Sequence, residues 1–287
     1  MAILASGLEF PEGPVMLDDG GLLVVEMSPA TGQISRISAD GREKEVLAQT
    51  GRPNGLAMDR AGNIWVAETR QRALLRLAPD GRIDTVADAC DGERFLFPND
   101  VAVGPDGAIY MTDSGVLEDD LAPNGEVNPE WYKLPVDGRI FRIDPASREV
   151  TCLLSGIQFA NGLAFSSDGQ LFANETLTGE IFRIASQGRR IPFGNVVATP
   201  RAMEEVKGPD GMKFAADGRS FHAVFGQGDI TVLAPDGTVE SRIPVEGTHP
   251  TNLAFGQPGS GDLYVTEAST NTLQKIHVGV DGLPLYR

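Results

Sequence analysis

This sequence of 287 residues lacks the features that mark several large classes of protein. Its two cysteines, Cys90 and Cys152, stand in unrelated contexts and do not form a disulfide framework. No stretch approaches the roughly 18 to 20 apolar residues that a membrane-spanning helix needs, and the first residues do not resemble a signal peptide. We therefore expect a cytoplasmic protein with reduced thiols and no membrane partner.

Basic residues are scarce relative to acidic ones. The chain has 24 Lys and Arg against 40 Asp and Glu, which gives a formal net charge of −16. Such a surface repels nucleic acid and anionic membranes, so neither is an expected partner. The excess of acid favours cations, although an acidic, soluble surface is also common without any such role.

The sequence has no amphipathic helical period of useful length. Instead, a sequence repeat recurs that predicts a loop, a short strand, a glycine turn and a second strand. This repeat occurs six times at spacings of 41 to 62 residues, a period typical of propellers and other repeat architectures. One aligned position, called the column below, holds Glu12, Asn54, Asn99, Asn161, Asp210 and Thr251. Six copies predict an all-β fold, a six-bladed β-propeller that occupies residues 1–287 as a single domain.

The ends of the chain are expected to meet in one blade. The last repeat has only three strands of its own, and a propeller with an unpaired edge in one blade would be prone to wrong pairing. The apolar piece at 3–8 is therefore predicted to supply the outer strand of the sixth blade. The spacing of 62 between Asn99 and Asn161 marks an insertion at about 114–137, either a lid over a central pocket or surface decoration.

Every residue of the column carries a side-chain oxygen, which is unusual for a position with a purely structural role. Two carboxylates and up to three amide oxygens on one axis suit a hard cation such as Ca²⁺, Mg²⁺ or Mn²⁺ better than Zn²⁺. The alternative is that Asn and Asp only cap the turn into the strand. A second set of acids recurs at the ends of the second strands and is expected to be structural: Glu26, Glu68, Asp113, Glu175 and Glu267.

Four motifs in order resemble the senescence marker protein/gluconolactonase/luciferin-regenerating-enzyme (regucalcin-like) family: Glu-Gly-Pro at 12–14, Pro-Asn-Asp at 98–100, Asn-Gly-Leu-Ala-Phe at 161–165 and Pro-Asp-Gly-Met at 209–212. The resemblance covers the whole chain and implies a six-bladed propeller. It implies that Glu12, Asn161 and Asp210 ligate one divalent cation, usually Ca²⁺, with Mg²⁺, Mn²⁺, Zn²⁺ and Fe²⁺ as alternatives. It also implies that Asn99 is a further ligand or a substrate contact, and that Asp210 is the acid/base or nucleophilic residue.

The resemblance also concerns Arg94, which stands where many bacterial sugar lactonases of this family carry an arginine thought to contact substrate. The sequence departs from those members at Leu96 and Phe97, where polar residues are common, so the pocket is expected to be more apolar. This departure puts a simple aldonolactone substrate in doubt.

These residues predict a metal-dependent hydrolase that opens a lactone, with the cation polarising the carbonyl and Asp210 as general base. Asn99 and Asn54 are expected to orient a small-molecule substrate, His249 is a candidate support or proton shuttle, and Trp131 is a candidate contact from the insertion. Two alternatives stay open. One is an organophosphate-type ester hydrolase that uses the same metal site, and the other is a non-catalytic propeller that serves as a binding protein.

Overall fold

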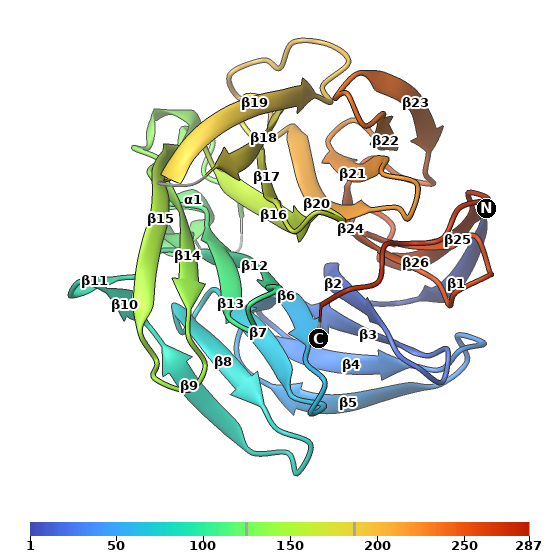
Figure 1. Ribbon diagram of the computed structural model, residues 1–287, viewed down its shortest axis with the longest axis horizontal. Helices are drawn as coiled ribbons and strands as arrows, with labels where there is room; N and C mark the ends of the chain where they lie inside the picture. Colours follow the sequence, from blue (N-terminus) through green and yellow to red (C-terminus); the bar gives the residue numbers. More distant parts are fainter. Residues whose placement is uncertain (124–125, 186–187, 287) are drawn as a thin grey trace.

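Residues 1–123, 126–185 and 188–286 are described by the structure, a computed structural model. Among them, six four-stranded antiparallel sheets are arranged as the blades of a propeller, as the sequence predicts (Figure 1). Blades one to three comprise β2(Pro11–Met16) to β5(Lys44–Gln49), β6(Pro53–Met58) to β9(Ile83–Ala87), and β12(Pro98–Val103), β13(Ile109–Asp113), β14(Gly138–Ile143) and β15(Val150–Ile157). Blades four to six comprise β16(Ala160–Phe165) to β19(Arg189–Asn195), β20(Gly208–Phe214) to β23(Val239–Pro244), and β24(Pro250–Phe255) to β26(Thr272–His277) with β1(Ala2–Ser6).

The remaining strands of blades one, two, four, five and six are β3(Leu22–Glu26), β4(Gln33–Ile37), β7(Ile64–Glu68), β8(Ala73–Leu77), β17(Leu171–Glu175), β18(Glu180–Ala185), β21(Ser220–Phe225), β22(Asp229–Leu233) and β25(Asp262–Glu267). Outside the blades lie a small hairpin, β10(Ala89–Cys90) and β11(Glu93–Arg94), and two short helices, α1(Glu118–Leu121) and η2(Trp131–Lys133). No helix of the described residues is long and apolar enough to cross a membrane.

The N-terminal strand closes the propeller, which confirms the prediction for the sixth blade. β1 pairs antiparallel with β26, with Ala2 opposite Lys275 and Ser6 opposite Thr272. The last sheet therefore has the order β1-β26-β25-β24, and the first residues of the chain protect the edge that the last repeat leaves open.

Apolar residues of neighbouring blades pack into clusters that hold the propeller together. One cluster joins Val25 of blade one to Val66 of blade two, and another joins Phe172 of blade four to Met212 of blade five. The innermost strands β2, β6, β12, β16, β20 and β24 contact one another in a closed cycle around a central channel. All six innermost strands run in the same direction along the channel. The end at which they begin is named the upper end, and the end at which they finish is named the lower end.

Hydroxyl groups join one blade to the next at the upper end of the channel. Each hydroxyl donates a hydrogen bond to a carbonyl at the start of the next innermost strand, over 2.7 to 2.9 Å: Thr69 to Pro98, Ser114 to Ala160, Thr176 to Pro209 and Thr251 to Pro11. The last of these bonds runs from the sixth blade to the first. These hydroxyls fix the positions at which the innermost strands start.

The acids at the ends of the second strands hold the loops that lead into the innermost strands, as predicted for structural residues. Asp113 accepts the N–H groups of Leu96 at 2.7 Å and Phe97 at 2.9 Å, and Glu267 accepts the N–H of His249 at 2.6 Å. Each acid thereby satisfies backbone donors that would otherwise be buried without a partner.

Glycine follows the column in four of the six innermost strands because the strands approach too closely for a side chain. A Cβ added to Gly211 would lie 2.1 Å from Cγ and Oδ1 of Asn252, and one added to Gly55 would lie 2.4 Å from Oδ1 of Asp100. We expect Gly211→Ala to lower the free energy of unfolding by about 3 kcal/mol, the upper part of the range for overpacked sites. Urea unfolding measures the change, and a variant as stable as the wild type would contradict the close approach.

Candidate functional site

The column residues face the channel because the regular pairing of each innermost strand with the second strand of its blade is interrupted at this point. In all six blades the pairing with the second strand shifts register at or just after the column, for example between Glu12 and Val15 and between Pro209 and Met212. Such an irregularity bends a strand and redirects its side chains. Five of the six column side chains are buried and Asp210 is partly buried, so the structure brings together the residues predicted as ligands.

Two carboxylates of the column repel each other across the channel. Burial raises the pKa of Glu12 well above its usual range, and the negative charges of Asp210 and Asp100 raise it further. Burial likewise raises the pKa of Asp210 well above its usual range, with Asp100 as the second cause. Burial raises the pKa of Asp100, whereas the positive charge of Lys213 lowers it and offsets part of this repulsion. The remaining repulsion favours the binding of protons or a cation.

Asp100 and Asn252 complete this group, and the sequence analysis assigned neither a role. They occupy the position directly after the column, which is glycine in the other four blades. Asp100 accepts the N–H of Val101 at 2.8 Å, and Asn252 donates from Nδ2 to Oε2 of Glu12 at 3.1 Å. The exchange of glycine for a polar side chain in two of six otherwise regular repeats was the signal that could have revealed them.

The two predicted amide ligands each turn their NH₂ group toward a hydroxyl. Asn161 donates from Nδ2 to Thr176 Oγ1 at 3.1 Å, and Asn99 donates from Nδ2 to Ser114 Oγ at 3.0 Å. In the described part of the chain, Oδ1 of Asn161 is buried and has no hydrogen-bond partner. A buried acceptor without a donor normally costs free energy, so this oxygen calls for a cation or for a proton held by the neighbouring Asp210 carboxyl.

The residues present therefore fit a hard cation. Glu12 and Asp210 offer carboxylate oxygens, and Asn161 offers an unpaired amide oxygen, the ligand types that Ca²⁺ and Mg²⁺ prefer. Among the described residues no three His, Cys, Asp or Glu side chains form a metal-binding group, so a cation here needs the amide oxygens as well.

The other predicted residues differ in how close they come to this centre. Asn54 is buried in the column of blade two, whereas Thr251 uses its hydroxyl to join blades six and one. His249 lies two residues before the column of blade six, with its ring stacked on Phe225 at 4.3 Å between centroids. Arg94 stands apart, on the β10–β11 hairpin at the outer edge of the molecule (Figure 1), with Nη2 bonded to the carbonyl of Gln71. Its contact with substrate stays a prediction.

The insertion at 114–137 is tied to two other parts of the propeller. Glu118 of α1 accepts hydrogen bonds from Arg52 at 2.5 Å and Arg70 at 3.1 Å, both in blade two. Trp131 of η2 is buried and donates from Nε1 to the carbonyl of Glu204 at 3.1 Å, in the loop that leads to blade five. The indole therefore anchors the insertion, a role that the sequence did not indicate.

A buried histidine supports the backbone of Asp210 through an intermediate amide. His222 is fully buried and contacts Asn174 Oδ1 at 3.1 Å and Ser220 Oγ at 2.9 Å. Asn174 in turn donates from Nδ2 to the carbonyl of Asp210 at 2.6 Å. Burial lowers the pKa of His222 to about 3, so the imidazole is neutral in the folded protein.

This lowered pKa predicts a stability loss in acid. An unfolded chain binds a proton at His222 below pH 6.5 and the folded chain does not until about pH 3, so stability falls as the pH drops through that interval. Between pH 6.5 and 4.5 we expect the wild type to lose about 2 kcal/mol more than His222→Gln does. Urea unfolding at several pH values measures this, with His277→Gln as the exposed control. Equal losses in wild type and His222→Gln would contradict the assignment.

Comparison with known proteins shows relatives along most of the chain. The family model described as "SMP-30/Gluconolactonase/LRE-like region" matches residues 10–269. A gluconolactonase of Zymomonas mobilis subsp. mobilis is 27% identical over 297 residues, covering 95% of this chain and 80% of its own. The pentonolactonase XacC of Haloferax volcanii is 28% identical over 262 residues, covering 90% and 81%.

A solved structure has the same fold. A protein of Agrobacterium tumefaciens, described as the calcium-binding protein regucalcin, superposes with a TM-score of 0.76 over 100% of this chain and 99% of its own, at 19% identity. The family match contains all six column positions, from Glu12 to Thr251. This chain belongs to the SMP-30/gluconolactonase/LRE-like family.

Proposed function

We propose that this protein is a metal-dependent lactonase, with one divalent cation held by Glu12, Asn161 and Asp210 and with Asn99 as a fourth ligand or substrate contact. The observation that carries the proposal is the buried, unpaired oxygen of Asn161 beside two mutually repelling carboxylates. The gluconolactonase and pentonolactonase relatives support the reaction, and the regucalcin neighbour supports Ca²⁺ as the cation.

When bound, the cation would supply Lewis-acid polarisation of the lactone carbonyl and would lower the pKa of its carboxylate ligands. Asp210, once ionised, would take the proton of the water that attacks the carbonyl. The hydrogen bond from Asn174 to the Asp210 carbonyl fixes the strand that presents this carboxylate. Asn99 and Asn54 would orient oxygens of the substrate, and His249 would border the opening.

The residues that precede the column favour a substrate with an apolar part. Two positions before the column, the six blades carry Phe10, Arg52, Phe97, Phe159, Gly208 and His249. The rings of Phe97 and Phe159 lie 6.1 Å apart, and the guanidinium of Arg52 lies 5.8 Å from the Phe97 ring. The phenylalanine rings offer apolar surface and no hydrogen-bonding group, so we infer that a lactone with an aliphatic or aromatic substituent suits this rim.

Proton release at constant pH tests the reaction class. The panel contains sugar, aliphatic and aromatic lactones and one organophosphate, and metal-stripped protein receives Ca²⁺, Mg²⁺, Mn²⁺, Zn²⁺ or Fe²⁺ in turn. We expect metal-dependent turnover of a substituted lactone. Turnover of the organophosphate alone would replace the proposal with phosphoester hydrolysis, and silence across the panel in protein shown to hold a cation would favour a binding role.

A further inference from the structure

The innermost strands of the propeller carry very few charges. In β2, β6, β12, β16, β20 and β24 the acidic residues are Glu12, Asp100 and Asp210, and the one basic residue is Lys213. Three negative charges and one positive charge give these six strands a net charge of −2. A cation in the column would feel each of these charges strongly, because little water lies between them to screen them.

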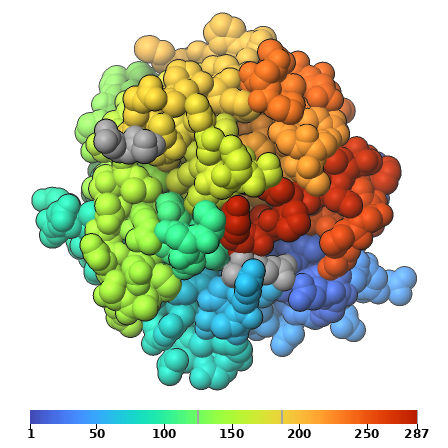
Figure 2. All heavy atoms as spheres, in the orientation of Figure 1, coloured from blue at the N-terminus to red at the C-terminus, as the bar shows by residue number. Residues whose placement is uncertain are grey.

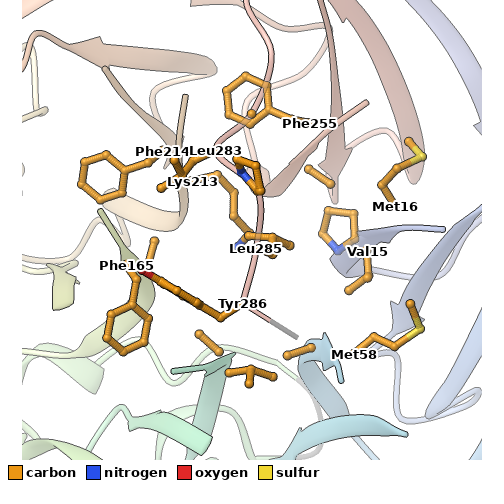
Figure 3. A pocket seen from close by; sticks show the side chains of 18 of the residues that line it. Val15, Met16, Met58, Phe165, Lys213, Phe214, Phe255, Leu283, Leu285 and Tyr286 are labelled. Atoms are coloured by element: carbon orange, nitrogen blue, oxygen red, sulfur yellow. The ribbon is translucent and has the colours of Figure 1, made fainter. Parts of the chain in front are cut away.

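Lys213 departs from the repeat inside a cavity of about 360 Å³ in the lower half of the channel. Three residues after the column, the other five blades line this cavity with small apolar residues: Val15, Ala57, Ala102, Ala164 and Ala254. Figure 3 shows the Lys213 side chain extending into the cavity. Figure 2 shows the last part of the chain, in red, across the centre of this face, and Leu283 and Tyr286 of that segment add to the lining. A positive charge in such surroundings is costly unless an opposite charge lies near it.

Asp100 departs from the repeat one level higher and has the opposite charge. It directly follows the column of blade three, where four of the other five blades have glycine. Its buried carboxylate accepts the N–H of Val101 at 2.8 Å and, in blade four, the N–H of Leu163 at 3.4 Å. Blade four in turn contacts blade five, which carries Lys213. Burial raises the pKa of Asp100 and the positive charge of Lys213 lowers it, so the two departures from the repeat interact through their charges.

We propose that Asp100 and Lys213 form a charge pair that sets the net charge of the column site, so that Lys213 offsets Asp100 and one divalent cation neutralises the remaining charge of −2. The pair adds to the proposed cation site, on which this inference rests, two residues that act by charge and not as ligands. If Asp100 loses its charge, the ammonium of Lys213 repels the cation without compensation. If Lys213 loses its charge as well, the net charge of the site returns to its original value.

Calorimetric titration of the metal-stripped whole protein with Ca²⁺ and La³⁺ tests the charge pair. Asp100→Asn keeps the size of the side chain and an acceptor oxygen, and it should weaken Ca²⁺ binding by about tenfold or more. The loss should be larger for La³⁺, because the charge of Lys213 acts on three charges of the ion instead of two. Adding Lys213→Met to Asp100→Asn should restore the Ca²⁺ affinity to within about threefold of the wild type. Lys133→Met, at an exposed ion pair with Glu130, should restore nothing in the same background.

Two further results separate the charge pair from the cation site itself. A wild type that binds neither ion would contradict the proposed function, whereas Ca²⁺ binding that Asp100→Asn leaves unchanged, or that Lys213→Met does not restore, would overturn only the role of the pair. Melting of the cation-free protein tests the pair without any ion. Lys213→Met should lower the melting temperature of the wild type by about 5 °C or more, because Asp100 stays buried without its opposite charge, and should not lower that of Asp100→Asn. Equal losses in the two backgrounds would overturn the coupling between the residues.

Discussion

Asp210→Asn is expected to lower kcat/KM for the preferred lactone by about a thousandfold or more. The substitution keeps the size of the side chain but removes the second carboxylate of the column, which is proposed as the base. General bases contribute about 10² to 10⁴ in rate, and this residue is also a proposed cation ligand. Steady-state hydrolysis of the best lactone in the panel, with saturating cation, measures the effect.

The matched control is Asp168→Asn, at an exposed turn of blade four where the carboxylate bonds to Ser166 and Gln170. It should retain the wild-type kcat/KM. The Asp210 variant should also unfold at a temperature no lower than that of the metal-stripped wild type, because it removes a charge that burial and the carboxylates of Asp100 and Glu12 oppose. Wild-type turnover by purified Asp210→Asn would remove Asp210 from the mechanism.

Glu12→Gln is expected to weaken cation binding by about a hundredfold or more. The carboxylate is buried, and Asn252 donates to its Oε2 at 3.1 Å, a bond that the amide oxygen of glutamine can still accept. The variant therefore removes a charged ligand while the local packing stays the same, and hard cations depend strongly on the number of charged ligands. Calorimetric titration of metal-stripped protein with Ca²⁺ and Mn²⁺ measures the change.

Glu9→Gln, three residues away on the surface, is the control and should bind the cation as the wild type does. Without cation, Glu12→Gln should be at least as stable as the wild type, because burial and two neighbouring carboxylates oppose the charge of Glu12. Equal cation affinity in the two variants would exclude Glu12 as a ligand.

The fold could be predicted because one sequence repeat occurs six times, and the order of the six copies along the chain is also their order around the propeller. The glycine turns and the alternating strands define each blade, and the missing strand of the last repeat points to β1. The column could be predicted for the same reason, since a residue at one place in every blade must lie at one level of the channel. The six column positions were identified in this way, whereas the choice of Glu12, Asn161 and Asp210 as ligands followed from the resemblance to the family.

Contacts between distant segments were not predictable, because no repeat encodes them. The bond between Arg52 and Glu118 and the bond between Trp131 and the carbonyl of Glu204 depend on how the insertion folds back on other blades. Arg94 shows the opposite case. Its place in the family pattern suggested a substrate contact, but the sequence did not indicate the hairpin that carries it or its hydrogen bond to the carbonyl of Gln71.

The polar residues after the column were missed because a single replacement of glycine carries little weight in one sequence. Asp100 and Asn252 gain their meaning only when neighbouring strands are seen to touch at that level, where a Cβ on Gly211 would collide with Asn252. The same holds for His222, whose link to Asp210 runs through Asn174 of another blade.

Restoration of lactone hydrolysis in metal-stripped protein by added cation tests the central claim most directly. Activity is recorded while Ca²⁺ or Mn²⁺ is added in steps to a known concentration of protein. We predict that the stripped protein is inactive and that turnover rises to a plateau at one cation per chain, with no rise in Asp210→Asn. Full turnover by stripped protein, before any cation is added, would contradict the claim that the column works as a cation site.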